Sequence, residues 1–135
     1  MIIRDYNSND NMELIKLFNE CFDKDYKCIC MSPSSKIFVM EFNNKIIGMA
    51  SIDILNDIFK NIKYGYVNNV CVSKECQGKG FGKELMSKID EYAKEMDLEY
   101  IILTSNKKRI AAHKLYKKCG YEIVDTCFFK KKLFK

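Results

Sequence analysis

The sequence predicts a single α/β domain over residues 1–135, termed α+β in some schemes, with a mixed, mostly antiparallel sheet of six to seven strands and helices on both faces. Its 135 residues, 47% of them hydrophobic, suffice for one core and leave no room for a second domain. The spacing of apolar residues along the chain predicts the elements in the order strand, helix, three strands, helix, strand, helix and two strands. No linker or repeat interrupts this order.

The first strand and the first helix are expected within residues 1–22. Residues 1–6 have the pattern of a short strand. Asp10, followed three residues later by Glu13, has the form of a capping box at a helix start. The apolar positions that follow recur every three to four residues and predict one buried helix face: Leu14, Ile15, Phe18, Cys21 and Phe22. Residues 23–36 are predicted to form a loop or weak helix.

A hairpin and a third strand are expected next. Residues 37–42 and 46–52 are rich in β-branched and apolar side chains, and a short turn containing Asn43 and Asn44 separates them. Asparagine accepts the positive φ angles of a tight turn, so the two runs should pair antiparallel. Residues 64–72 are again rich in aromatic and β-branched residues, which predicts a neighbouring strand.

The C-terminal half is predicted to alternate helices and strands. Residues 81–96 keep a helical apolar period, and residues 98–104 follow as a strand. Residues 109–119 form the next predicted helix, and Gly120 stands where a left-handed cap is favoured. Two short strands then close the domain, residues 121–124 and 127–133.

A glycine-spaced loop at residues 77–82 lies between a predicted strand and a predicted helix. Free amide groups in the first turn of a helix favour an anion, and glycines let a ligand approach the backbone. The loop is not a P-loop, which needs glycine at the position of Gln77. It is not a dinucleotide fingerprint either, because lysine stands where that motif needs glycine, at position 83.

The segment Gln77-Gly78-Lys79-Gly80-Phe81-Gly82, after a Val-x-Val strand, resembles the acetyl-coenzyme A motif of the GNAT superfamily of N-acetyltransferases. A second family pattern follows in the correct order, in which a helix carrying Tyr116 ends before the pair Gly120-Tyr121. Two ordered motifs are more specific than either alone. The resemblance by motif covers residues 64–121, and the predicted element order is similar to the family's fold throughout.

This resemblance implies direct transfer of the acetyl group of acetyl-CoA, the co-substrate, to a primary amine of a small molecule or protein in a ternary complex, with no metal. It implies a gap between the fourth and fifth strands, where the backbone N–H of Val72 stabilises the developing oxyanion. It also implies that Tyr116 protonates the departing thiolate. The residues implied in coenzyme binding are Val70, Cys71, Val72, Gln77, Gly78, Lys79, Gly80, Phe81, Gly82, Lys83, Arg109, His113 and Tyr116.

Three of these residues have a second interpretation. Tyr116 has the helical spacing of a core residue, although the motif around it favours a functional role. His113 is expected to line the ligand or to be structural rather than to act as a base, although it is the only histidine. Arg109 replaces an asparagine found in many relatives, and it either meets a coenzyme phosphate or is a solvated charge.

The general base is not identified by the sequence. Some family members carry a carboxylate on the strand before the loop, whereas this chain has Asn68 and Asn69 there. The remaining candidates are an ordered water, a carboxylate elsewhere such as Asp53 or Glu41, and bulk solvent acting before binding. The missing strand carboxylate supports an alternative function, a non-catalytic acyl-CoA-binding regulatory module.

Composition limits the other function classes. The net charge is +5, but the lysines are dispersed and there are only two arginines, so no nucleic-acid partner is expected. No apolar run could span a bilayer, and the seven cysteines lack a zinc or redox spacing, so a cytoplasmic, reducing location is expected. Homodimers are common among relatives, but nothing in the sequence demonstrates one. The acceptor should be recognised by loops at residues 23–35, 56–63 and 125–126.

Overall fold

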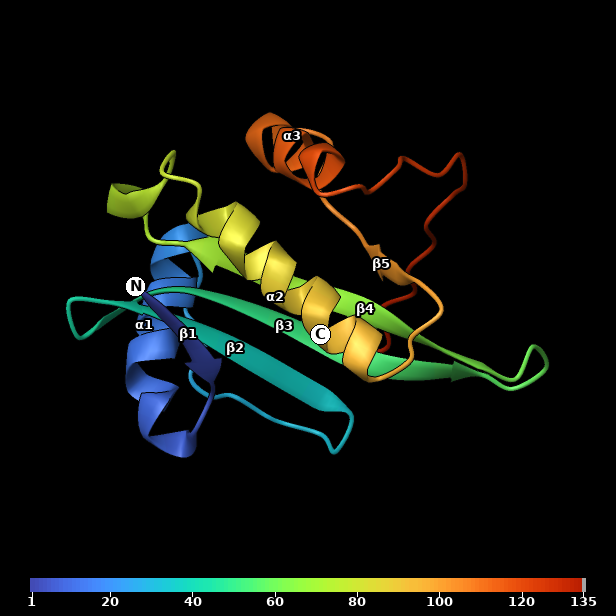
Figure 1. Ribbon diagram of the computed structural model, residues 1–135, viewed down its shortest axis with the longest axis horizontal. Coiled ribbons are helices and arrows are strands. Elements are labelled where there is room, and N and C mark those ends of the chain that lie inside the picture. Colours follow the sequence, from blue (N-terminus) through green and yellow to red (C-terminus); the bar gives the residue numbers. More distant parts are fainter. Residues whose placement is uncertain (135) are drawn as a thin grey trace.

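The computed structural model describes residues 1–134 and contains a five-stranded sheet in the order β1-β2-β3-β4-β5 (Figure 1). The strands are β1 (Ile2–Asp5), β2 (Ser35–Phe42), β3 (Lys45–Asp57), β4 (Ile62–Val72) and β5 (Ile101–Leu103). Strands β1 to β4 pair antiparallel, and β5 pairs parallel to β4. The mixed, mostly antiparallel sheet is therefore confirmed.

Helices cover both faces of the sheet, as predicted (Figure 1). The helices are α1 (Asn11–Phe22), α2 (Phe81–Glu95) and α3 (Ile110–Lys118). Successive strand residues point to opposite faces, so Phe38 joins the core under α2 while the adjacent Val39 joins the core under α1. Tyr116 of α3 belongs to the α2 core.

The predicted β2–β3 hairpin is also confirmed. Asn43 and Asn44 have φ angles of 52° and 60°, the left-handed conformation that the turn requires. Gly120 has a φ of 93° after α3, as expected for a left-handed helix end.

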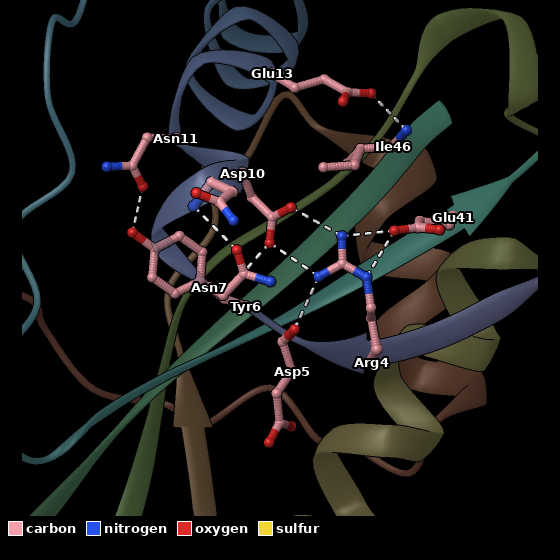
Figure 2. A network of polar contacts seen from close by, with 10 residues as sticks. Arg4, Asp5, Tyr6, Asn7, Asp10, Asn11, Glu13, Glu41 and Ile46 are labelled. Atoms are coloured by element: carbon pink, nitrogen blue, oxygen red, sulfur yellow. Dashed lines mark hydrogen bonds and ion pairs between the residues drawn. The ribbon is translucent and has the colours of Figure 1, made fainter. Parts of the chain in front are cut away.

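The predicted capping box at Asp10 and Glu13 is wrong, and the box lies one turn earlier. Asn7 and Asp10 form it around a short 3-10 turn, Ser8–Asp10. Figure 2 shows the reason: Asp10 is held by Arg4 at 2.8 Å, and the Glu13 carboxylate accepts a hydrogen bond from the Ile46 backbone N–H at 2.6 Å. Both carboxylates are therefore bound to other residues and do not accept from the backbone N–H groups that the predicted capping box would use.

The two C-terminal strands are not formed, so five strands replace the six to seven that were predicted. Residues 121–134 have no regular secondary structure, and Ile123, Phe129 and Phe134 are 77%, 89% and 88% exposed. A strand pattern is stable only where one face packs against a core, and this segment buries almost none of its apolar side chains. Among residues 1–134, no helix is long and apolar enough to cross a bilayer.

Candidate functional site

Strands β4 and β5 separate beyond a short parallel pairing. Gly65 to Val67 pair with Ile101 to Leu103, after which β5 ends and β4 continues to Val72. A β-bulge marks the point of separation, because Val67 pairs with Ile52 and Asn69 pairs with Ser51, leaving Asn68 as the extra residue. The last residues of β4 therefore present a free strand edge.

The β4 backbone offers hydrogen-bonding groups to this gap at Val70 and Val72. Ser73 donates its N–H to the Ile47 carbonyl at 2.7 Å, so its backbone faces β3. Antiparallel pairing alternates, so Cys71 also faces β3, and Val70 and Val72 direct their N–H and C=O groups the other way. Consistent with this, the Val72 carbonyl accepts a hydrogen bond from the Gln77 side chain at 3.1 Å.

The glycine loop leaves open space at the start of α2. Gly78 and Gly80 have φ angles of 78° and 84°, and a Cβ at either position would meet no atom within 4 Å. Gly80 is the N-cap of α2, and within the described chain no side chain bonds to the free amides there. Lys79 and Lys83 lie on the same turn and are exposed. The loop thus fits a ligand with an anionic group that approaches the backbone closely.

Two neighbouring cavities flank the bulge on β4. A cavity of about 200 Å³ lies beside the gap and is lined by residues that include Val70, Leu103 and Tyr116. A second cavity of about 370 Å³ lies between α1, the loop after it and the sheet. Four residues line both cavities: Phe18, Tyr26, Asn68 and Asn69. The two cavities are therefore adjacent.

Tyr116 is 8% exposed and lines the smaller cavity. Burial raises the pKa of its phenol above the ordinary value of 10.0, and the neighbouring Arg109 partly offsets that rise. The phenol therefore stays protonated at neutral pH and can donate a proton.

Arg109 and His113 occupy different surroundings. The Arg109 guanidinium lies over the Phe22 ring, 5.2 Å from its centroid, and also lines the smaller cavity. This position is beside Tyr116 rather than at the glycine loop. His113 Nε2 bonds to the Asn106 carbonyl at 2.9 Å, which ties α3 to the loop before it.

Cys71, predicted at the coenzyme, has its side chain in the α1 core and its backbone toward β3. It interacts there with Cys21, which also donates its thiol to the Val72 carbonyl at 3.4 Å. The hydrogen bond with Cys71 lowers the pKa of the Cys21 thiol to about 7, and the same contact together with burial raises that of Cys71.

The structure separates the two carboxylates that the sequence left as candidates. Glu41 is bound by Arg4 at 2.5 Å and lines neither cavity (Figure 2). Asp53 lines the larger cavity, accepts a hydrogen bond from Ser35 Oγ at 2.5 Å, and accepts another from the Asn68 side chain.

Two aromatic residues of the site were missed by sequence reasoning. Phe18 was assigned to the helix core, but it packs on Tyr26 with ring centroids 5.7 Å apart where the cavities meet. Tyr26 lies in an irregular loop, where no periodicity marks its neighbours. The Asn19 side chain fixes it by bonding to its backbone N–H and carbonyl, each at 3.0 Å.

Comparison with known proteins gives a consistent result. The chain matches the Acetyltransferase (GNAT) family over residues 3–121. It is 29% identical over 100 residues, 73% of this chain, to the uncharacterized N-acetyltransferase YobR of Bacillus subtilis, but spans only 38% of that protein's length. It is 26% identical to the uncharacterized N-acetyltransferase MJ1530 of Methanocaldococcus jannaschii over 90% of this chain and 78% of that one. A putative acetyltransferase from Agrobacterium tumefaciens has a similar fold, with a TM-score of 0.86, 20% identity, and coverage of 98% of this chain and 100% of that one.

Proposed function

Since this chain belongs to the Acetyltransferase (GNAT) family, we propose that it transfers the acetyl group of acetyl-CoA to a primary amine by direct attack in a ternary complex. The observation that carries the proposal is the free edge of β4 at Val70 and Val72. It runs from the cavity beside Tyr116 to the uncapped start of α2. A co-substrate with a thioester at one end and a diphosphate at the other matches this layout.

The binding groups are mostly backbone atoms. The amides from Gln77 to Gly82 hold the diphosphate, helped by the partial positive charge of the α2 N-terminus. Lys79 and Lys83 add exposed positive charge next to this site. Val70 and Val72 pair with the amides of the pantetheine arm in the manner of an added strand.

The chemistry requires three groups. A neutral amine forms a bond to the thioester carbonyl carbon, and the N–H groups of the β4 edge at Val70, beside the cavity, and Val72 are the donors for the oxyanion that develops there. The carbon–sulfur bond then breaks, and Tyr116 gives its proton to the departing thiolate. The attacking nitrogen loses its extra proton to solvent, and Tyr116 regains a proton from solvent. The overall products are the amide, free CoA and the proton lost by the ammonium form of the acceptor.

Transfer is tested by release of free thiol from acetyl-CoA with polyamines, aminoglycosides, amino sugars and peptides as acceptors. The expected result is thiol release with at least one amine class, at a rate that falls strongly in Tyr116→Phe. Tight binding of acetyl-CoA by calorimetry with no release across the panel would instead favour a non-catalytic acyl-CoA-binding module. The burial of Tyr116 at the cavity beside the β4 edge argues against that module.

A further inference from the structure

We propose that the larger cavity takes a small monocationic amine with an apolar body, and that Asp53 binds its ammonium group and accepts the proton that this nitrogen loses before it attacks the thioester. This inference rests on the proposed acetyl transfer, because it names the acceptor class of the same site. It starts from the lining of the larger cavity, in which Asp53 is the only charged residue among residues 1–134. One carboxylate matches one ammonium, and the rest of the lining is polar or apolar but uncharged.

The Asp53 carboxylate lines the larger cavity next to Asn68, a residue that both cavities share. Ser35 Oγ donates to one of its oxygens, and the Asn68 side chain donates to the other. Asn68 is the bulge residue of β4 and lines both cavities. An ammonium at Asp53 therefore lies in the larger cavity, close to the shared residue Asn68 on the strand whose edge is proposed to hold the thioester.

The apolar wall of the cavity selects the rest of the acceptor. Phe18 and Tyr26 provide aromatic rings at the junction, and apolar side chains of α1, the following loop and the sheet continue the wall: Leu14, Ile15, Ile29, Met31, Ile37 and Met49. Aromatic faces attract a cation, and an apolar body gains from leaving water. At about 370 Å³, the cavity lies near the lower end of the usual range for small-molecule sites, roughly 300 to 1,000 Å³.

This lining disfavours two other acceptor classes. A polyamine or an aminoglycoside carries several ammonium groups, and in this cavity all but one would lack an anionic partner. A peptide would leave polar backbone groups against the apolar wall, where each unpaired group is costly. The chemistry therefore favours an arylalkyl or alkyl monoamine.

The first experiment compares acceptors for the wild-type protein. Initial rates of thiol release are measured with 2-phenylethylamine, spermidine, kanamycin and a short peptide with a free N-terminal alanine. The expected result is a kcat/KM for 2-phenylethylamine at least tenfold above the others. A higher kcat/KM for spermidine, kanamycin or the peptide would overturn the inference and leave acetyl transfer intact.

The second experiment tests Asp53 directly with Asp53→Asn and the matched control Asp25→Asn. The control removes the same charge from an exposed carboxylate outside the cavity that pairs only with Lys27. For Asp53→Asn, the Kd of 2-phenylethylamine in the presence of CoA should rise about 10- to 100-fold, the loss expected for a hydrogen bond to a charged group. The Kd of CoA alone should be unchanged, which shows that the variant is folded. Equal amine affinity in wild type and Asp53→Asn would refute the assignment.

Binding and turnover separate the two proposals. Amine binding that depends on Asp53 without thiol release would overturn acetyl transfer and support the amine site. If Asp53→Asn fails to fold or to bind CoA, Asp53→Glu replaces it, because a retained charge should keep the affinity within about tenfold of wild type. An amine affinity in Asp53→Glu reduced more than this, with CoA binding intact, would contradict the role of the charge.

Discussion

Replacing Gly80 with alanine separates backbone strain from ligand binding in the glycine loop. Gly80 has a φ of 84°, and its added Cβ would meet no atom within 4 Å, so the folded protein suffers strain but no clash. A non-glycine residue in this conformation costs about 1 to 2 kcal/mol, which corresponds to a Tm lower by about 5 °C. The added methyl group would also stand in the space proposed for the diphosphate.

Gly120→Ala is the matched control for this variant. Gly120 has a φ of 93°, and its added Cβ also meets nothing within 4 Å, but it lies after α3 and outside the loop at residues 77–82. Both variants should therefore lose similar stability in thermal melts. Only Gly80→Ala should weaken CoA, by about 10- to 100-fold if one or two hydrogen bonds to the diphosphate are lost.

Calorimetry with CoA measures the difference between the two glycine variants. Titrations at a temperature well below both melting points ensure that each sample is folded. An equal Kd for CoA in wild type, Gly80→Ala and Gly120→Ala would refute the assignment of the α2 N-terminus as the diphosphate site. A loss of affinity in both variants would show that strain anywhere in the domain weakens binding.

Three further predictions concern side chains. Tyr116→Phe should lower kcat about 100-fold with little change in KM, as measured by steady-state thiol release. The control Tyr92→Phe, which changes a tyrosine of α2 that packs against Phe38, should leave kcat unchanged in the same assay. Arg4→Met should destabilise the fold by about 1 to 3 kcal/mol in urea titrations, because it leaves the buried Asp10 carboxylate without its partner, whereas Lys27→Met removes an exposed pair and should have no measurable effect. Burial raises the pKa values of Tyr116 and Tyr121 above 10.0, so the contribution of these two phenols to stability is complete below pH 10 and is lost as the pH rises further. In thermal melts from pH 8 to 11, the Tm of Tyr121→Phe should therefore fall less than that of the wild type. An equal fall in Tm in both proteins would contradict this role of Tyr121.

The sequence predicted the elements whose signals are local. The hairpin turn at Asn43 and Asn44, the helix that begins at Phe81 and the left-handed glycine after α3 each depend on a few neighbouring residues. The capping box was misplaced because Asp10 and Glu13 bind Arg4 and Ile46, partners that are distant in sequence or in another element. The C-terminal strands were predicted from the local sequence, which does not reveal whether a core covers one face of a strand.

In the candidate site, too, the features with local sequence signals were predicted, and those assembled from distant segments were not. The loop at residues 77–82 and Tyr116 are visible as motifs, whereas the cavity at Asp53 is assembled from α1, the loop after it and three strands. Asp53 could be named as a carboxylate, but its contact with Asn68 depends on the pairing of β3 and β4. Only the fold could distinguish it from Glu41, which Arg4 holds outside both cavities.

The β-bulge at Asn68 explains how one strand serves both cavities. Val67 and Val70 both lie in the core under α2 although they are three residues apart, an odd spacing that a regular strand would place on opposite faces. The extra residue of the bulge shifts the alternation of side chains along β4 by one position. Val70 and Val72 therefore have their side chains in the same core as Val67, and their backbone groups face the gap. It also brings the Asn68 amide to Asp53 on β3. The carboxylate of the neighbouring strand thus reaches a residue that lines both cavities, as the proposed amine site requires, although β4 itself has no carboxylate.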